Sequence, residues 1–345
     1  MKLWKRATAF GMAALAAGVL GGCRIGEDTN WVAQYHETTV PAGVYISSLL
    51  GSYYSETAEI SSDVKNPLKE QVDGVSVSDK IVSASRQLLN EYIAVEQKFD
   101  EMGLTLDAQT QQVLQQNIEM FWMYVGESYE QNGVSRSSYE QTMANTSKRM
   151  ALFEKLYGEG GELEVPESEL RQQFNEDWTK ILVIPLYFST SEDEEVRAKN
   201  EKDTREMIQK YYEKAKAGED MEEVVFEAHK EASSDPDSLT KPEPGSSYTF
   251  VSKSNPQYDD TIVKAIFDAP LGEPTIAESE TGMYMFVRYD INENPNDFES
   301  RKMNLTEQLR GEAYNELVKE WANTLSGVTF NEKAFSRYTP SKLKV

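Results

Sequence analysis

The sequence has 345 residues, and its composition is strongly acidic. It holds 58 acidic against 35 basic residues, so its formal net charge is −23 and its sequence pI is about 4.6. Because nucleic-acid phosphates would repel such a chain, we exclude nucleic acid as a partner. With 39% hydrophobic residues, a chain of this length can build two cores rather than one.

The residue types used for metal binding and covalent catalysis are scarce. Cys23 is the single cysteine, and the two histidines, His36 and His229, lie far apart without the spacing of metal ligands. No motif brings a nucleophile together with a base, which argues against a hydrolase. We therefore expect no metal site and no cofactor.

The first residues have the pattern of a secretory leader. A basic start (Lys2, Lys5 and Arg6) precedes an uncharged, apolar run over residues 7–22. This run is too short and too rich in small residues for a comfortable membrane span, but it suits a signal peptide. No later segment is apolar enough to span a membrane.

The tetrapeptide Leu20-Gly21-Gly22-Cys23 resembles a lipobox, the motif at which bacterial lipoproteins are acylated on cysteine and cleaved before it. The resemblance implies a signal peptide over 1–22, a lipid on Cys23 and a tether over 23–30. It places the protein outside the cell, anchored by lipid to the outer face of the bacterial cytoplasmic membrane. The alternative is an ordinary signal or signal-anchor with an incidental cysteine.

Residues 31–178 are predicted to form a helical domain. Residues 31–35 alternate like a short strand, and a helix opened by Pro41 follows within residues 40–60. Four further helices are predicted at 76–103, 106–133, 135–161 and 165–178. In the first of these, one side carries the apolar residues Ile81, Leu88, Leu89, Ile93 and Phe99.

Residues 120–124 (MFWMY) are apolar on every side of their helix. We favour core packing as their role. The alternative is a client-binding surface, because methionine and aromatic side chains adapt to varied partners.

Residues 179–291 change in character and predict an α+β domain. The run KILVIPLYFST reads as a buried strand. The elements that follow give the order β-α-α-β-α-β-β, with helices at 192–217, 221–233 and 258–269 and strands at 247–252, near 274–279 and at 282–291. Residues 292–296 then form a loop, and a C-terminal helical segment over 297–338 is expected to return to the N-terminal helices.

Three segments of this domain resemble the parvulin family of peptidyl-prolyl isomerases. They are YYEKAKAGEDMEEVVFEAHKEASSDP at 211–236, AIFDAPLGEPT at 265–275 and ETGMYMFVR at 280–288. The lipobox, the helical domain, the inserted domain and the returning helix together resemble PrsA-type foldase lipoproteins, and the helical part is similar to SurA-type chaperones. The resemblance covers nearly all of the chain after the leader.

The resemblance also implies candidate site residues. Asp235 falls where parvulins have Cys or Asp, Thr281 where they have Ser or Thr, and Tyr284 at the second of two family histidines. These three are the candidate catalytic residues. Leu186 falls at the first histidine position, and the substrate-binding candidates are Leu186, Phe250, Tyr258, Ile262 and Phe267.

Loss of both histidines leaves isomerase activity open. Prolyl isomerisation breaks no covalent bond, and its barrier of about 18–20 kcal/mol is loss of amide resonance, so no nucleophile is obligatory. We favour a domain kept for peptide binding over an efficient isomerase. The resemblance then implies a foldase or chaperone acting on unfolded or nascent secreted polypeptides, with a homodimer as the candidate assembly. The alternative is a non-catalytic scaffold lipoprotein that binds one envelope partner.

Overall fold

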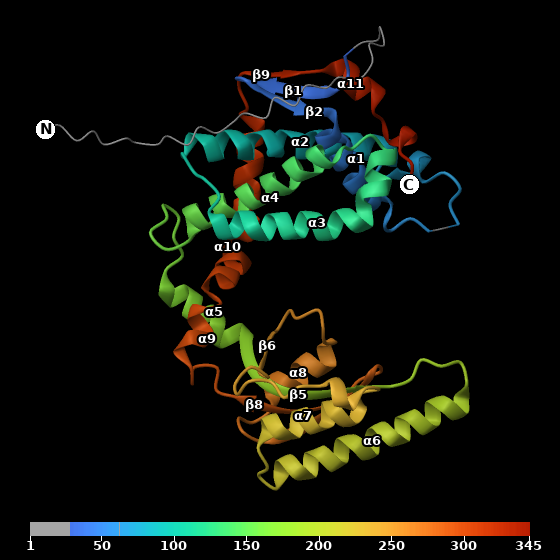
Figure 1. Cartoon of the computed structure of the whole chain (residues 1–345), viewed down its shortest axis with the longest axis vertical. Coiled ribbons are helices and arrows are strands. Elements are labelled where there is room, and N and C mark those ends of the chain that lie inside the picture. Colours follow the sequence, from blue (N-terminus) through green and yellow to red (C-terminus); the bar gives the residue numbers. More distant parts are fainter. Residues whose placement is uncertain (1–27, 62) are drawn as a thin grey trace, which may run out of the picture. The chain divides into compact units, whose positions relative to one another are not determined.

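The computed structural model of the chain describes residues 28–61 and 63–345 (Figure 1). The predicted signal peptide over 1–22, most of the predicted tether and Cys23, the predicted lipidation residue, lie outside the described residues. The prediction of a lipid anchor is therefore not tested by the structure.

The chain divides into two compact units. One holds the residues up to Glu96 together with Asp107–Thr146 and Trp321–Val345, and the other holds Gln97–Leu106 and Ser147–Glu320. Three of the crossings between units fall inside long helices, namely α2 (Val77–Glu101), α4 (Arg136–Tyr157) and α10 (Lys302–Asn323). The predicted domain boundaries at 178 and 291 instead enclose the segment from the first to the last strand of the predicted α+β domain, and they stay a prediction.

The first unit contains a small sheet with the strand order β2-β1-β9. Strand β1 (Trp31–Tyr35) confirms the predicted strand, and β2 (Thr38–Pro41) folds back on it through a turn in which His36 has φ of 47°. Strand β9 (Val328–Phe330) pairs antiparallel with β1. The sequence analysis did not foresee β2 or β9, because each is too short to show an alternating pattern.

Helices make up most of the first unit. Helix α1 (Ala42–Thr57) begins directly after Pro41, as predicted, and α3 (Ala108–Gln131) begins after Asp107, whose side chain accepts a hydrogen bond from the Thr110 amide at 2.7 Å. A hairpin of β3 (Gln71–Val72) and β4 (Val75–Ser76) lies between α1 and α2, after a short 3₁₀ turn, η1 (Pro67–Lys69). The chain ends with α11 (Glu332–Arg337) and η3 (Pro340–Lys342).

The buried side of α2 corrects one sequence prediction. One row of residues with a four-residue spacing is fully buried: Val77, Ile81, Ser85, Leu89 and Ile93 are each at most 1% exposed. Leu88, predicted to lie on this side, is 43% exposed. Adjacent residues lie well apart around a helix, so of the two neighbouring leucines only Leu89 follows this row, and apolar character alone could not tell them apart. Ser85 belongs to the row as well, and its hydroxyl donates to the Ile81 carbonyl at 2.6 Å.

The second unit is built on a four-stranded antiparallel sheet with the order β6-β5-β8-β7. The strands are β5 (Trp178–Tyr187), β6 (Thr249–Ser252), β7 (Pro274–Glu278) and β8 (Gly282–Tyr289). With α6 (Glu194–Lys216), α7 (Met221–Ala232) and α8 (Asp260–Asp268), they give the predicted β-α-α-β-α-β-β order. The chain is thus of mixed α+β class, mostly helical, with this sheet in its middle.

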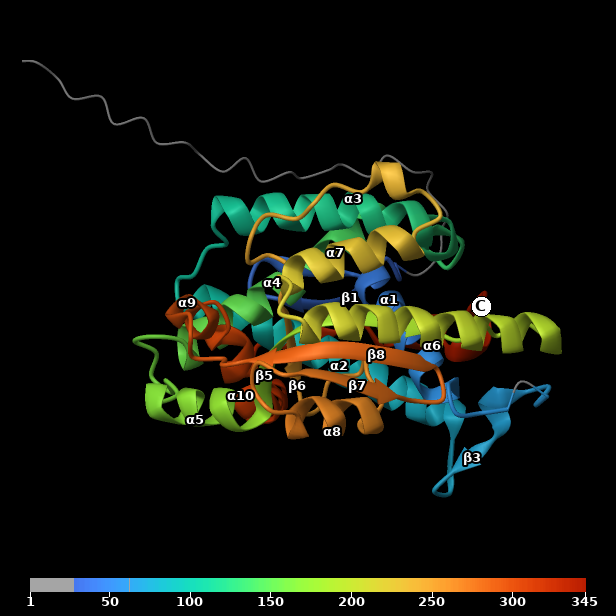
Figure 2. The same cartoon turned by 90° about the horizontal axis from the view of Figure 1, so that it is seen from below.

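The sheet has an apolar core on each face. Figure 2 shows α6 and α7 on one side of the strands and α8 on the other. On the α6–α7 side, Leu182 and Ile184 of β5 are buried with Met283 and Met285 of β8. On the α8 side, the core holds Ile181, Val183, Ile262, Ile266, Tyr284 and Phe286. Alternate residues of β5 therefore face opposite helices, which explains its continuous apolar sequence.

A third core cluster lies where the sheet meets α5 (Glu167–Asp177), α9 (Pro295–Glu299) and the start of α10. The rings of Phe174 and Phe298 lie 5.5 Å apart at an edge-to-face angle. Farther along, Tyr314 of α10 donates a hydrogen bond to the carbonyl of Arg149 in α4 at 2.6 Å. The C-terminal helix is thereby fixed to the second half of α4.

Candidate functional site

Three tyrosines meet on the α8 side of the sheet, and we call them the tyrosine cluster. Tyr284 lies in β8, Tyr187 ends β5, and Tyr258 precedes α8. The Tyr284 ring centre lies 6.2 Å from that of Tyr187 and 5.8 Å from that of Tyr258, and both pairs are edge-to-face. Tyr284 is 3% exposed and Tyr187 is 61% exposed, so the cluster runs from the core to the surface.

The Tyr284 hydroxyl is held as a neutral hydrogen-bonding group. Burial is the main cause that raises its pKa, while side-chain hydrogen bonds with Thr281 and Ser279 act in the opposite direction. Burial likewise raises the pKa of Tyr258. The Thr281 and Ser279 hydroxyl oxygens lie 3.0 Å apart. Tyr284 and Tyr258 therefore offer apolar ring faces and neutral hydroxyl donors.

Five of the eight catalytic and substrate-binding candidates come together here. Thr281 contacts Tyr284, Ile262 of α8 is fully buried in the same core, and Tyr258 and Phe267 pack against that core from its edge. The local reason is that Asp259 caps α8 by accepting a hydrogen bond from the Ile262 amide at 3.0 Å. Whether these residues bind a peptide stays a prediction.

Leu186 and Phe250 lie elsewhere. Leu186 packs on the opposite face of the sheet with the α6–α7 core, because neighbours in a strand point to opposite faces. Tyr187, one residue later, occupies the place beside Tyr284 instead. Phe250 packs in the cluster of α5, α9 and α10, where the Arg301 guanidinium lies 3.2 Å from its ring centre.

Asp235 is also apart from the tyrosine cluster. It lies in an exposed stretch before a 3₁₀ turn, η2 (Pro236–Ser238). Its amide donates to the Ser233 hydroxyl at 3.1 Å, and its carbonyl accepts from the Ser238 hydroxyl at 2.9 Å. These contacts hold a turn, and the structure shows no contact between the Asp235 carboxylate and Tyr284.

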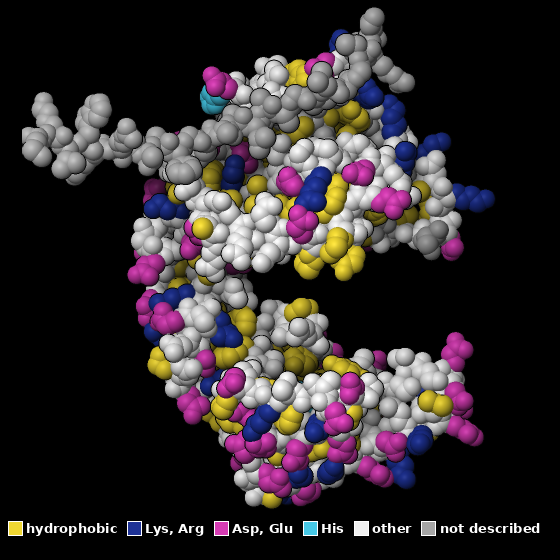
Figure 3. All heavy atoms as spheres, in the orientation of Figure 1, with side chains coloured by type: hydrophobic (Ala, Val, Ile, Leu, Met, Phe, Trp, Pro, Cys, Tyr) yellow, Lys and Arg dark blue, Asp and Glu magenta, His cyan; other side chains and the backbone are white. Residues whose placement is uncertain are grey.

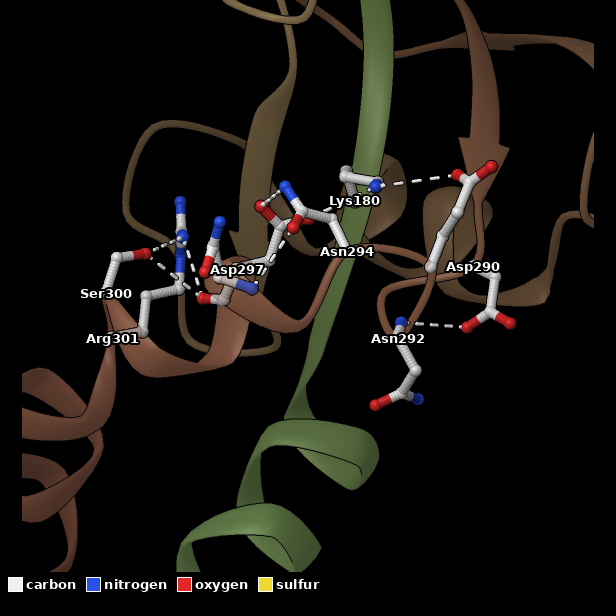
Figure 4. Close-up of polar contacts among 9 residues, drawn as sticks. Lys180, Asp290, Asn292, Asn294, Asp297, Ser300 and Arg301 are labelled. Carbon is white, nitrogen blue, oxygen red and sulfur yellow. Dashed lines mark hydrogen bonds and ion pairs between the residues drawn. The ribbon is translucent and has the colours of Figure 1, made fainter.

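The sequence analysis missed a nearly buried lysine in β5. The Lys180 side chain is 5% exposed, and its Nζ lies 3.2 Å from an Asp297 carboxylate oxygen and 3.7 Å from one of Glu293. Figure 4 shows this group, with Asn294 beside Asp297. A basic residue opening the apolar run KILVIP was the available signal. The arrangement joins the sheet to α9, which indicates a structural role.

The outer side of α3 carries exposed apolar residues, which we call the α3 stripe. Its members are 44–80% exposed: Val113, Met120, Phe121, Met123 and Tyr124. Figure 3 shows hydrophobic side chains gathered on this helix. Within residues 120–124, Trp122 alone packs inward, 5.3 Å from the Tyr139 ring. The favoured role of residues 120–124 as core is therefore wrong for the other four.

Other kinds of site find little support. Within residues 28–61 and 63–345, no group of three or more His, Cys, Asp or Glu side chains could hold a metal ion. A partly open depression is lined only by polar and charged residues: Gln173, Asp177, Ser252, Lys253, Ser254 and Gln308. Small-molecule sites are mostly apolar and enclosed, so this depression does not resemble one.

In the part of the chain that the structure describes, no helix is both long and apolar enough to cross a membrane.

Comparison with known proteins gives a structural similarity. No protein-family model matches the chain, and no curated protein matches it. The foldase protein PrsA of Streptococcus pneumoniae is similar at 14% identity and a TM-score of 0.41, over 78% of this chain and 97% of that one.

Two further PrsA structures are similar. That of Lactococcus lactis matches at 12% identity and a TM-score of 0.41, over 90% of this chain and 99% of its own. That of Bacillus subtilis matches at 12% identity and a TM-score of 0.36, over 76% and 94%. The chain is thus structurally similar to PrsA foldases over most of its length, at low identity.

Proposed function

We propose that this protein is a lipid-anchored, extracytoplasmic chaperone that holds unfolded polypeptides on the α3 stripe. The observation that carries the proposal is the exposure of the stripe, which reaches 76% at Met123 and 80% at Tyr124. Contiguous exposed apolar side chains mark interaction surfaces. Unfolded chains expose apolar residues of many shapes, and the flexible methionine side chain can pack against them.

The stripe is supported by a rigid inner side. On that side of α3, Leu114 is 8% exposed and Ile118 is fully buried. Trp122 packs on Tyr129 and Tyr139. Because this side fixes the helix, a client would meet a preformed surface and the protein would lose little conformational freedom on binding.

Suppression of aggregation tests the proposal. The protein without residues 1–23 is mixed with two unrelated unfolded proteins, and light scattering is followed with wild type and with a Met123→Gln/Tyr124→Gln variant. We expect the double variant to lose most of the suppression, because it removes exposed apolar surface and no side chain of the core. Val196→Gln, at an apolar residue of α6 that is 49% exposed, is the matched control.

The results separate the proposal from its rival. If the double variant suppresses aggregation as well as wild type does, the α3 stripe is not the binding surface. If wild type fails to protect either unrelated protein but binds one envelope protein, the scaffold function replaces the chaperone function.

The tyrosine cluster favours a second activity, peptidyl-prolyl isomerisation. Its ring faces suit a proline ring, and the Tyr284 hydroxyl can donate to an amide that has lost its resonance. Cis-to-trans conversion of short Xaa-Pro peptides tests this with Tyr284→Phe, Asp235→Ala and, as control, Tyr248→Phe. An isomerase at the cluster should lose about tenfold or more in rate with Tyr284→Phe alone. No acceleration by wild type would assign the domain to binding.

Anchoring is tested separately. We expect wild type expressed in a bacterium to remain with the membrane fraction and a Cys23→Ser form to be released, because the lipid needs the thiol. Retention of Cys23→Ser on membranes would contradict the anchor.

A further inference from the structure

The α3 helix has no basic residue over its full length from Ala108 to Gln131, although it carries three glutamates. They are Glu119, Glu127 and Glu130, and all three are exposed. All charged residues of the helix that carries the α3 stripe are therefore acidic, in a chain whose net charge is −23.

The glutamates lie along one edge of the stripe. Residues three and four apart are neighbours on a helix surface. Glu119 and Glu127 are thus the neighbours of Met123 on either side, and Glu127 is also a neighbour of Tyr124 and Glu130. A ligand packed on Met123 and Tyr124 would have these carboxylates within reach of its polar groups.

The carboxylates of Glu127 and Glu130 are available to pair with a cation of a ligand, whereas that of Glu119 is already paired. Arg136 pairs with Glu119 and with Glu140. The described contact of Glu127 is with the neutral Gln131 amide at 3.1 Å, and Glu130 is exposed. The C-terminal Lys344 reaches the end of this helix with its backbone amide, which donates to Asn132 at 2.7 Å.

We propose that the α3 stripe selects polypeptide segments in which large apolar residues are flanked by lysine or arginine. The inference rests on the proposed chaperone function and names its client class. Apolar residues would pack on Met123 and Tyr124, while the cations meet Glu127 and Glu130. Net negative charge also steers cationic chains toward the protein, and it opposes the meeting of two copies of this acidic helix.

The charge contribution is modest and depends on salt. Exposed ion pairs contribute only weakly, so two of them correspond to about three- to tenfold in affinity. Salt screens such pairs. Apolar packing would supply the rest of the affinity and would persist at high salt.

Two synthetic peptides with the same leucine and phenylalanine pattern test the proposal, one with lysine and one with glutamate at every polar position. Binding of each labelled peptide to the full mature chain is measured by fluorescence anisotropy at low and high salt. We expect the lysine peptide to bind at least about tenfold tighter at low salt, because the carboxylates attract its lysines and also repel the glutamates of the other peptide, and we expect the difference to shrink at high salt.

Matched variants locate the effect. Glu127→Gln/Glu130→Gln should weaken the lysine peptide about three- to tenfold and leave the glutamate peptide unchanged or tighter. Glu307→Gln/Glu312→Gln removes two exposed charges from α10 instead. It should leave the affinity for both peptides unchanged. Met123→Gln/Tyr124→Gln keeps every charge and should abolish binding, which excludes unspecific attraction to an acidic protein.

Each contrary result has its own meaning. Equal binding of both peptides, insensitive to Glu127→Gln/Glu130→Gln, overturns the charge selection and leaves the chaperone function standing. If neither peptide binds and aggregation of unrelated proteins also continues, the proposed function fails as well. A dimer in sedimentation that dissociates in Met123→Gln/Tyr124→Gln would make a second copy the occupant and overturn the proposal.

Discussion

Burial of tyrosine hydroxyls sets an alkaline limit to the stability of this protein. Burial is the first cause that raises the pKa of Tyr211, Tyr284, Tyr289 and Tyr314 above the ordinary value of 10.0. In the unfolded chain these phenols lose their protons near pH 10, while in the folded chain they keep them to higher pH. Their contribution to stability is therefore complete below pH 10 and is lost as the pH rises through the folded values.

We expect the contribution of these tyrosines to the free energy of unfolding to begin to fall near pH 9 and, above pH 10, to fall by about 1.4 kcal/mol per pH unit for each tyrosine. Urea unfolding at a series of pH values measures this directly. Absorbance at the phenolate band should rise together with loss of circular dichroism. Smooth ionisation at pH 10 without unfolding would contradict the burial of these hydroxyls.

The Lys180 group provides a matched pair of substitutions. Asp297 is 16% exposed at its side chain and Glu293 is 67% exposed, yet both contact the Lys180 ammonium. Asp297→Asn leaves a buried charge poorly compensated and should cost about 3 kcal/mol in unfolding free energy. Glu293→Gln breaks an exposed pair and should cost less than about 1 kcal/mol. Urea unfolding of both variants measures the two losses of unfolding free energy. Equal losses would contradict the greater contribution of the buried pair.

The separation of Leu186 from Tyr284 shows a limit of motif matching. It can place a residue in a strand, but it cannot decide which face of the sheet the residue is on. Matching put Leu186 at the first family position, but the strand register pairs Pro185 with Tyr284 and leaves Leu186 on the other face. A shift of one residue reverses the face in a strand. Tyr187 could be identified beside Tyr284 only after the pairing was known.

At the scale of single elements, neighbouring leucines of α2 test the buried row. Leu89 is 1% exposed and Leu88 is 43% exposed. Leu89→Ala should lower the unfolding free energy by about 2–5 kcal/mol, because it opens a cavity in the core. Leu88→Ala should change it by less than about 1 kcal/mol. Thermal unfolding of the two variants measures both changes. A larger loss of unfolding free energy in Leu88→Ala would contradict the orientation of the helix.

The ends of elements were predictable from local residues. Gly103 follows α2 with φ of 63°, and Gly218 follows α6 with φ of 85°. Glycine adopts this left-handed backbone conformation without strain, so it marks helix ends in the sequence. The α3 stripe was not predictable in the same way, since an apolar helix side can be buried or exposed depending on what packs against it.

At the scale of the whole chain, the first unit depends on residues from both ends of the sequence. Phe335 of α11 is 6% exposed, and its ring centre lies 4.8 Å from that of Tyr45 in α1. Asn331 donates to the Asp28 and Trp31 carbonyls at 2.9 and 3.0 Å. These contacts join segments about 300 residues apart in sequence, which slows folding but stabilises the finished unit.

Phe335→Ala should therefore cost about 3–5 kcal/mol in the unit that contains β1. Tyr124→Ala, at an aromatic residue of the same unit that is 80% exposed, should cost less than about 0.5 kcal/mol. Hydrogen exchange measured by peptide should accelerate in β1 and β9 in Phe335→Ala and stay unchanged in β5 and β8. Acceleration throughout the chain would show that the two units unfold together.

The sequence by itself determined most helices, the order of the inserted α+β domain and its mixed fold class. These depend on spacing of apolar residues and on glycines, which act locally. The tertiary structure decided that Leu88 and the α3 stripe are exposed, that β9 pairs with β1, and that Tyr187 and Lys180 meet their partners. Each of these depends on strand register or on contacts between residues far apart in the chain, and no local pattern encodes them.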